Sequence, residues 1–260
     1  MNVPENQRIA VIIPAKDESA RIAATVRAAR SIPRVDMVFV IDDGSEDDTQ
    51  TVARAAGAKV VRHTVNRGKA SAMETGAGVA TMNDVDGQPP RILLFLDADL
   101  GETAIECAPL ILPILEGTAD CTIANFPPQK GAGGRGFVTG LGRDAIKKLT
   151  GWAPQQPLSG QRCITREAFE AVKPLASGWG VEVGMTIDLL VNGYTVQEVL
   201  CDLKHRASKN DLAGQIHRAK QYKDVWLAVN KRRLQRVFVP KNKRVKSNGS
   251  PFEPFNSYRD

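Results

Sequence analysis

The sequence predicts an α/β protein with a mostly parallel, doubly wound sheet flanked by helices. Short apolar runs alternate with helical segments through the first hundred residues, which is the pattern of strands joined by helical crossovers. Met37–Ile41 and Ile92–Leu96 are continuously apolar, as expected of parallel strands that are covered on both faces. Acidic and glycine-bearing segments follow these runs directly, where ligands of such sheets bind.

The first half of the chain supplies four strands and three helices in alternation. The expected strands are Arg8–Ile13, Met37–Ile41, Lys59–Arg62 and Ile92–Leu96. The expected helices are Ala20–Ala29 with Ser19 as a candidate N-cap, a helix capped by Asp47 or Asp48 that ends at Ala56, and Gly68–Thr81.

The second half is less regular. Asn125–Gly136 contains two prolines and four glycines, so we expect a mobile loop there. The expected strands are Cys121–Ala124, Arg162–Thr165 and Val196–Leu203, and the expected helices are Phe137–Leu149, Arg166–Val172, Val181–Val191 and Leu212–Arg233. In the last helix Leu212, Ile216, Ala219, Tyr222 and Trp226 recur at helical spacing and predict an amphipathic stripe.

Basic residues are concentrated near the C-terminus, although the chain as a whole has an ordinary composition of 42% hydrophobic and 25% charged residues. Lys231, Arg232, Arg233, Arg236, Lys241, Lys243, Arg244 and Lys246 follow one another with no acid between them. Because these eight positive charges exceed the net charge of +6, the rest of the chain carries a small net negative charge. A basic end suits lipid headgroups, nucleic acid or a neighbouring subunit, and a solvated, flexible end is the simpler interpretation.

The four cysteines, Cys107, Cys121, Cys163 and Cys201, form no C-x-x-C pair and are expected to be reduced, buried thiols. The N-terminal residues lack the pattern of a signal peptide, and no apolar run approaches the ~20 residues of a membrane span. We therefore expect a cytoplasmic protein, with peripheral contact at the inner membrane surface through the basic end as an open alternative.

Four segments with polar side chains follow the first four predicted strands. They are Pro14–Glu18, Asp42–Ser45, Asn66–Lys69 and Asp97–Asp99. Because the carboxyl ends of parallel strands meet at one edge of a sheet, these segments predict a site for a polar ligand.

Asp97 and Asp99 are the sharpest candidates for chemistry. Two carboxylates at a strand end can hold Mg²⁺ or Mn²⁺ and leave coordination positions for phosphate oxygens, which a nucleoside diphosphate supplies. Lys69 opens a predicted helix and can face the same diphosphate. Capping and turn-forming roles for the two aspartates, and a solvated Lys69, are the structural alternatives.

Four segments then resemble a known family. VIIPAKDE, VFVIDDGSEDDT, NRGKASAMETG and LLFLDADL, in this order, are similar to the nucleotide-sugar half of GT-A fold, family 2-like glycosyltransferases. The later segments PLSGQR, GWGVEVG and LKHR narrow the resemblance to glucosyl-3-phosphoglycerate synthases, whose members are retaining enzymes.

The resemblance assigns roles to particular positions. It implies donor binding by Pro14, Ala15, Glu18, Asp43, Ser45, Lys69 and Asp97, metal binding by Asp99 and His205, and catalytic roles for Glu182 and Asp99. The family has a Gly-Arg-x-Thr stretch that binds the phosphate and carboxylate of phosphoglycerate. Here Arg135, Gly136 and Thr139 are the acceptor candidates, at an altered spacing and in a chain that is short for that family.

The expected function is that of a metal-dependent glycosyltransferase that moves a hexose, with glucose favoured, from a UDP-sugar to an anionic acceptor such as 3-phosphoglycerate. A GDP-sugar is less expected. The resemblance divides the chain into a nucleotide-sugar-binding half (1–124), an acceptor-binding half (125–206), the long C-terminal helix (207–236) and the basic end (237–260). An inverting reaction with Glu182 as the base stays open beside a retaining one.

Other functions stay open as well. A polyprenyl phosphate at the membrane surface is the alternative acceptor, with the basic end and the last helix as membrane contacts. A nucleotidyltransferase is disfavoured because the segment after the first strand, Pro14–Glu18, has no glycine. A nucleic-acid binder is disfavoured because no recognised motif is present. A catalytically inactive sugar-nucleotide binder and a homodimer are further alternatives.

Overall fold

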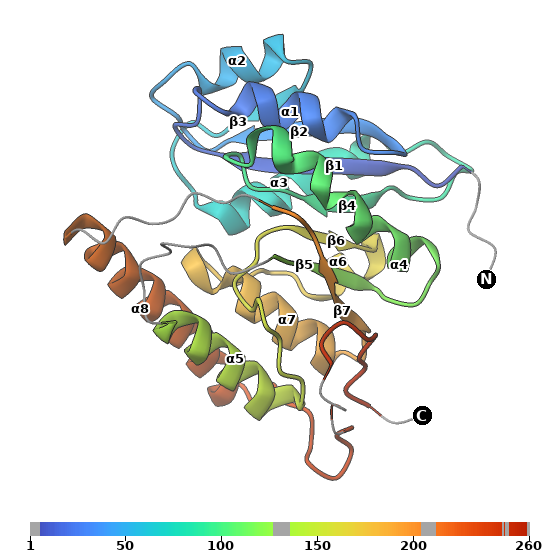
Figure 1. The fold of residues 1–260 in the computed structure, drawn as a ribbon, viewed down its shortest axis with the longest axis vertical. Helices are drawn as coiled ribbons and strands as arrows, with labels where there is room; N and C mark the ends of the chain where they lie inside the picture. Colours follow the sequence, from blue (N-terminus) through green and yellow to red (C-terminus); the bar gives the residue numbers. More distant parts are fainter. Residues whose placement is uncertain (1–5, 127–135, 204–211, 246, 248–249, 259–260) are drawn as a thin grey trace.

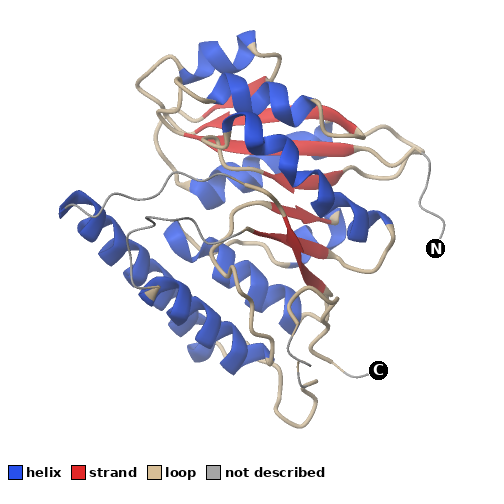
Figure 2. Cartoon of the chain, in the orientation of Figure 1, coloured by secondary structure: helices blue, strands red, loops and turns tan. Residues whose placement is uncertain are grey.

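The computed structural model describes residues 6–126, 136–203, 212–245, 247 and 250–258. They form a seven-stranded sheet in the order β3-β2-β1-β4-β6-β5-β7, with helices on both faces (Figures 1 and 2). The strands are β1 (Ile9–Ala15), β2 (Val35–Asp42), β3 (Lys59–Arg62), β4 (Ile92–Phe95), β5 (Cys121–Asn125), β6 (Arg162–Ile164) and β7 (Val196–Leu200).

The predicted mostly parallel sheet is confirmed. Strands β3, β2, β1 and β4 are parallel to one another, and β7 is parallel to β5. Strand β6 is the exception, because it runs antiparallel to both of its neighbours, β4 and β5. Residues before β6 therefore lie at the same edge of the sheet as residues after β4.

The helices come from segments close to those predicted. They are α1 (Ile22–Arg30), α2 (Thr49–Ala55), α3 (Lys69–Met82), α4 (Leu112–Leu115), α5 (Phe137–Thr150), α6 (Arg166–Ala171), α7 (Val181–Val191) and α8 (Leu212–Leu234), with 3₁₀ segments η1 (Gly101–Ile111) and η2 (Gly178–Gly180). Segment η1, which was not predicted from the sequence, packs against α1 on one face of the sheet.

Strand β1 shows how the sheet divides the core. Ile9, Val11 and Ile13 pack with α1 and η1 on one face, whereas Ala10 and Ile12 pack with α3 on the other, as the alternation of a strand requires. Gly76 lets α3 approach closely, because a Cβ at this position would lie 2.4 Å from Cγ2 of Ile12. Helices α5 and α8 pack against α7 and lie outside it (Figure 1).

One local expectation needs correction at the start of a helix. Ser19 is not the N-cap of the first helix, which begins at Ile22 after Arg21 with no side-chain cap. The Ser19 amide instead donates to Oδ2 of Asp47, 3.1 Å away. Asp47 also accepts from the Thr49 amide at 3.0 Å, so its carboxylate joins the segments after β1 and β2.

The predicted apolar stripe of α8 is wrong in its C-terminal part. Ala219, Tyr222 and Trp226 are exposed, whereas α8 buries Val225, Ala228, Val229 and Arg232. The reason is a close approach to α7 and η2: a Cβ on Gly180 would lie 2.5 Å from Cβ of Ala228, and Arg232 forms an ion pair with Asp188 of α7. Side chains of residues 212–218 lie outside the described part.

Part of the C-terminal end is packed against the rest of the protein, although Lys241 and Lys243 are exposed. Phe255 is buried and exchanges two backbone hydrogen bonds of 2.9 Å with Val196 of β7. The Arg244 guanidinium donates to the carbonyls of Lys148 and Leu149 at the end of α5, each at 3.1 Å. Arg232 and Arg244 are thus structural, and the expectation of a flexible end does not hold for these residues.

The four cysteines are free and buried, as expected. Burial raises the pKa of Cys121 and of Cys201 to about 12, so these thiols stay protonated and unreactive near neutral pH.

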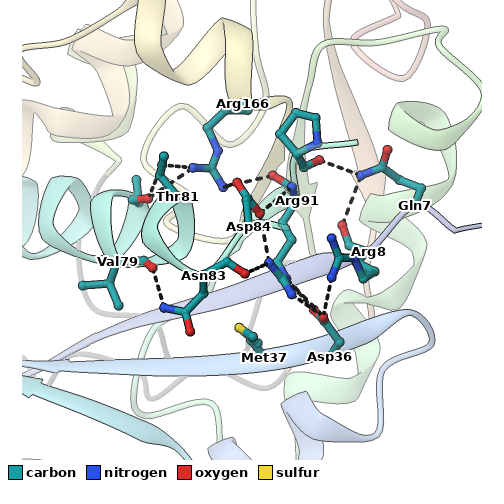
Figure 3. A network of polar contacts seen from close by, with 12 residues as sticks. Gln7, Arg8, Asp36, Met37, Val79, Thr81, Asn83, Asp84, Arg91 and Arg166 are labelled. Carbon is teal, nitrogen blue, oxygen red and sulfur yellow. Dashed lines mark hydrogen bonds and ion pairs between the residues drawn. The ribbon is translucent and has the colours of Figure 1, made fainter. Parts of the chain in front are cut away.

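A buried polar network ties together the amino ends of the strands, opposite the edge that carries the predicted site (Figure 3). The guanidinium of Arg91, only 1% exposed, forms two parallel hydrogen bonds of 2.9 and 2.8 Å with Asp36 of β2. It also pairs with Asp84 at 2.9 Å and donates to the carbonyl of Asn83. Arg166 of α6 pairs with the other oxygen of Asp84 at 3.4 Å. The network fixes the end of α3 and the starts of β4 and α6 against β2.

We predict that Arg91→Met lowers the free energy of unfolding by about 1–3 kcal/mol, because it removes the hydrogen bonds of a buried guanidinium to the partly exposed carboxylates of Asp36 and Asp84. Urea unfolding followed by circular dichroism measures this difference. Arg27→Met, at an exposed position of α1, is the matched control and should change stability by less than about 0.5 kcal/mol. Equal effects of the two substitutions would contradict the prediction.

Candidate active site

A cavity of about 330 Å³ lies at the carboxyl ends of β1 and β4. Its lining residues are Pro14, Lys16, Glu18, Lys69, Asp97, Ala98, Asp99, Val138, Leu158, Trp179, Glu182, Gln221 and Val225. Six of the predicted site residues, Pro14, Glu18, Lys69, Asp97, Asp99 and Glu182, therefore share one cavity. A second cavity of about 690 Å³ shares Lys16 with the first and is lined by Ser45, Arg62 and Asn66 among others.

The sheet explains why these residues meet. Parallel β1 and β4 are in register through Ile12 and Phe95, so Pro14 and Asp97 leave the sheet at the same edge. Antiparallel pairing of Phe95 with Arg162 brings the segment before β6 to the same place. Glu182 comes from a different element, the first turn of α7.

Lys69 joins the two halves of the site. It is the first residue of α3, and its Nζ lies 2.7 Å from Oδ1 of Asp97 and 2.9 Å from Oε1 of Glu182. Burial by itself lowers the pKa of the ammonium, but the two carboxylates outweigh burial and hold the pKa above its ordinary value. Lys69 is therefore a permanent cation, suited to anionic oxygens and unsuited to proton transfer near neutral pH.

The carboxylate of Asp97 is held at both oxygens. Oδ2 accepts a hydrogen bond of 2.6 Å from the side-chain amide of Gln161, and Ser159 Oγ lies 3.2 Å from the carbonyl oxygen of that amide. Gly160 packs against the same group: a Cβ on it would lie 2.5 Å from Nζ of Lys69 and 2.7 Å from Oδ1 of Asp97. In the sequence, the PLSGQR segment was notable only for its resemblance to the family, and no role was predicted for Gln161.

Arg162 stabilises the segment that carries Gly160 and Gln161. Its fully buried guanidinium donates to the carbonyls of Ser159 and Pro157 and to Oγ1 of Thr186 at 2.8 Å. Thr186 in turn donates to the backbone carbonyl of Glu182 at 2.9 Å. Burial lowers the pKa of Arg162. No carboxylate of the described residues lies within 4.0 Å of its guanidinium. One side chain thus fixes both the segment that carries Gln161 and the helix that carries Glu182.

Asp99 is the carboxylate available to a ligand. It lines the cavity. Among the described residues, the cation closest to its carboxylate is the Arg21 guanidinium at 3.9 Å, beyond hydrogen-bonding distance. A carboxylate with free lone pairs fits a hard cation such as Mg²⁺ or Mn²⁺. Within the described part of the chain, no group of three His, Cys, Asp or Glu side chains could hold a metal by itself. His205, the second predicted metal ligand, lies outside the described residues.

Asp43 lies behind the cavity rather than on its wall. It is 5% exposed and accepts hydrogen bonds from the amides of Arg67 and Gly68 at 2.8 and 2.7 Å. His63 Nδ1 lies 2.7 Å from the same carboxylate, and His63 Nε2 lies 3.0 Å from Oγ1 of Thr75. Asp43 and His63 thus fix the turn from which Lys69 emerges. His63 is a supporting residue that the sequence did not suggest.

Ala15 and Ser45 are also buried. The Ala15 carbonyl accepts from the Asp43 amide at 2.8 Å, and Oγ of Ser45 accepts from the Asp17 amide at 2.9 Å. Ser45 nevertheless borders the second cavity. These two positions hold the segments after β1 and β2 together.

The predicted acceptor residues fall at the start of α5. Gly136 precedes the helix with a left-handed φ of 66°, and Thr139 lies in its first turn beside Val138, which lines the cavity. Arg135 lies outside the described residues. The structure therefore brings the start of α5 to the cavity through Val138, and Thr139 is not among the described lining residues.

Known proteins match the chain in sequence and in structure. The glucosyl-3-phosphoglycerate synthase of Mycolicibacterium paratuberculosis is 33% identical over 196 residues, which cover 69% of this chain and 59% of that protein. The Mycobacterium tuberculosis synthase, solved with Mg²⁺ and UDP, superposes with a TM-score of 0.70 at 25% identity, covering 92% of this chain and 82% of that one. A complex of the same enzyme with Mn²⁺, UDP-glucose and phosphoglyceric acid gives a TM-score of 0.70 at 26% identity over 92% and 82% of the two chains.

The match to the curated relatives spans about three fifths of their length. The resemblance of the fold extends further along the chain, and it agrees with the predicted GT-A architecture, including the long C-terminal helix. The model of glycosyl transferase family 2 matches residues 10–169, which include β1 to β6 and the cavity residues Lys69, Asp97 and Asp99. This protein is a member of glycosyl transferase family 2.

Proposed function

We propose that the protein is a metal-dependent glycosyltransferase that moves glucose from UDP-glucose to a small anionic acceptor such as 3-phosphoglycerate. The observation that carries the proposal is the cavity in which Lys69 bridges Asp97 and Glu182 while Asp99 stays open to a ligand. The named activity of the relatives, and the UDP-glucose and phosphoglyceric acid bound in their structures, support this donor and acceptor class.

On the donor side, each residue has a role that its position favours. Asp99 and His205 would hold Mg²⁺ or Mn²⁺, which neutralises charge on the leaving diphosphate. Lys69 adds a fixed cation next to the same cavity, where low water access strengthens its attraction for phosphate oxygens. Pro14 and Glu18 line the nucleoside side, and the second cavity beside Ser45 is of a size to take the base. Asp43 acts through the turn that positions Lys69.

On the acceptor side, Arg135 supplies a guanidinium for phosphate or carboxylate oxygens, with Gly136 and Thr139 as backbone and hydroxyl donors. Glu182 lines the cavity, where its carboxylate can accept hydrogen bonds from hydroxyl groups of the sugar or the acceptor. We place the protein in the cytoplasm, which the four free, buried cysteines favour. A homodimer stays a prediction that sedimentation velocity tests.

The donor site is tested by calorimetric titration of UDP, with GDP as the comparison, each with and without Mn²⁺. We expect Mn²⁺-dependent binding of UDP that Asp99→Ala weakens at least tenfold, because the open carboxylate is lost. Asp86→Ala, at an exposed position outside the cavity, should bind as the unmodified protein does. Equal UDP binding with and without Mn²⁺ in the unmodified protein would overturn the proposed metal dependence.

The acceptor is tested separately by transfer assays with UDP-glucose and 3-phosphoglycerate, with a short-chain polyprenyl phosphate as the alternative. We expect glucosylated phosphoglycerate, and Arg135→Gln should raise the KM for phosphoglycerate at least tenfold while UDP affinity stays the same. Product formed only with the polyprenyl phosphate would reject the proposed acceptor but leave the donor site intact.

Gly160 gives a steric test of the Lys69–Asp97–Gln161 cluster. In Gly160→Ala the new methyl group would lie 2.5 Å from the Lys69 ammonium and displace it, so we expect Mn²⁺–UDP affinity to fall at least tenfold. Gly78→Ala in α3 is the control: a Cβ there meets no atom within 4 Å and should stabilise the helix by about 0.5–1 kcal/mol without affecting UDP. Unchanged UDP affinity in Gly160→Ala would show that the cluster does not bind the donor.

A further inference from the structure

The outward half of α8 carries an unusual set of side chains. Among its described side chains, Tyr222, Trp226, Leu227 and Leu234 are 45%, 49%, 47% and 84% exposed. At 3.6 residues per turn Leu227 and Leu234 lie on the side of the helix opposite Val225, Ala228 and Arg232, which pack inward, and Tyr222 and Trp226 lie on the flank between the two sides. The arrangement leaves two large aromatic and two leucine side chains facing outward.

The charges on this half are all positive. Lys220, Lys223, Lys231 and Arg233 are exposed and are interspersed with the apolar residues. The described segment 219–238 contains one acidic residue, Asp224. Its carboxylate turns inward and accepts a hydrogen bond of 3.2 Å from the backbone amide of Trp179. We call Lys220, Tyr222, Lys223, Trp226, Leu227, Lys231, Arg233 and Leu234 the outer face of α8.

We propose that the outer face of α8 binds the surface of an anionic lipid bilayer. Trp, Tyr and Leu insert into the boundary between headgroups and acyl chains, and Lys and Arg beside them attract anionic headgroups. The face is well placed, because α8 lies on the outside of the molecule, beyond α7 (Figure 1). No helix within the described ranges is long and apolar enough to cross a membrane, so the contact is peripheral.

Two other partners fit the chemistry less well. A second copy docked by two-fold symmetry would bring this all-basic face against itself, and like charges at such an interface repel. Single-stranded nucleic acid stacks on aromatic rings and binds cations, but it gains little from Leu227 and Leu234. An anionic bilayer is the partner that uses both the leucines and the lysines.

The contact has a functional consequence. Gln221 and Val225, from the inward side of the same helix, line the candidate active-site cavity. A bilayer against the outer face would hold the cavity within one helix diameter of the membrane. The inference does not depend on the acceptor, which can be water-soluble.

The test is flotation of the full-length protein with vesicles of phosphatidylcholine alone or of phosphatidylcholine with phosphatidylglycerol. We expect binding only to the anionic vesicles, falling as salt is raised. Lys220→Gln with Lys223→Gln should lower the partition coefficient about twenty-fivefold, at about fivefold for each lysine. Trp226→Gln with Leu227→Gln should lower it at least tenfold.

Matched controls lie on helices other than α8. Arg27→Gln with Arg54→Gln removes two exposed cations from α1 and α2, and Met82→Gln removes an exposed apolar side chain from α3. These variants should bind vesicles as the unmodified protein does. UDP titration of every variant reports the donor site independently, so loss of vesicle binding and failure of the proposed activity are distinguishable.

Three results would overturn the inference. The first is no flotation with anionic vesicles. The second is a dimer in sedimentation velocity that Trp226→Gln with Leu227→Gln dissociates, without vesicle binding, which would assign the face to a second copy. The third is flotation that the control substitutions weaken as much as the α8 substitutions do, which would indicate attraction by net charge alone.

Discussion

The Lys69 ammonium, shared between Asp97 and Glu182, is the interaction on which the site depends. Asp97 follows β4, and Glu182 lies in the first turn of α7, far away in the sequence. Two carboxylates brought this close repel each other unless a cation lies between them. Lys69 supplies that cation, so the strand edge and the helix can come together around one cavity.

Several other groups serve to keep Lys69 and its partners in place. Asp43 and His63 fix the turn that precedes Lys69, and Gln161 holds the second oxygen of Asp97. Arg162 supports Gln161 and Glu182 at once. Because a buried polar group that lacks partners is costly, such a connected set acts as a unit. The cluster leaves Asp99 as the carboxylate open to a ligand, which gives the two aspartates of the Asp97-Ala98-Asp99 segment different tasks.

The two ends of the sheet are built on different principles. At the amino ends of the strands, Arg91 is saturated by Asp36, Asp84 and the Asn83 carbonyl, so those charges are used for stability. At the carboxyl ends, Asp99, Lys16 and Glu18 still border open space. Helix α8 shows a similar division between its sides: Arg232 is buried against Asp188, whereas Lys231 and Arg233 face outward. Basic residues that are neighbours in the sequence therefore have unrelated roles.

The sequence by itself determined the strands, most of the helices and the edge of the sheet that carries the site. The expected bounds of Lys59–Arg62 and Val181–Val191 are those observed, because runs of apolar residues and their periods are local properties. The gathering of Pro14, Lys69, Asp97 and Asp99 also followed from the sequence, because the ends of parallel strands must meet.

Only the tertiary structure decided what depends on contacts between distant segments. Strand β6 runs antiparallel beside β4 and so delivers Gly160 and Gln161 to Asp97, which no local pattern indicates. Helix α8 turns Ala228 toward Gly180, and this contact leaves Trp226 outside although its spacing suggested burial. Side-chain spacing sets which residues share a face of a helix, but the shape of the neighbouring surface decides which face is buried.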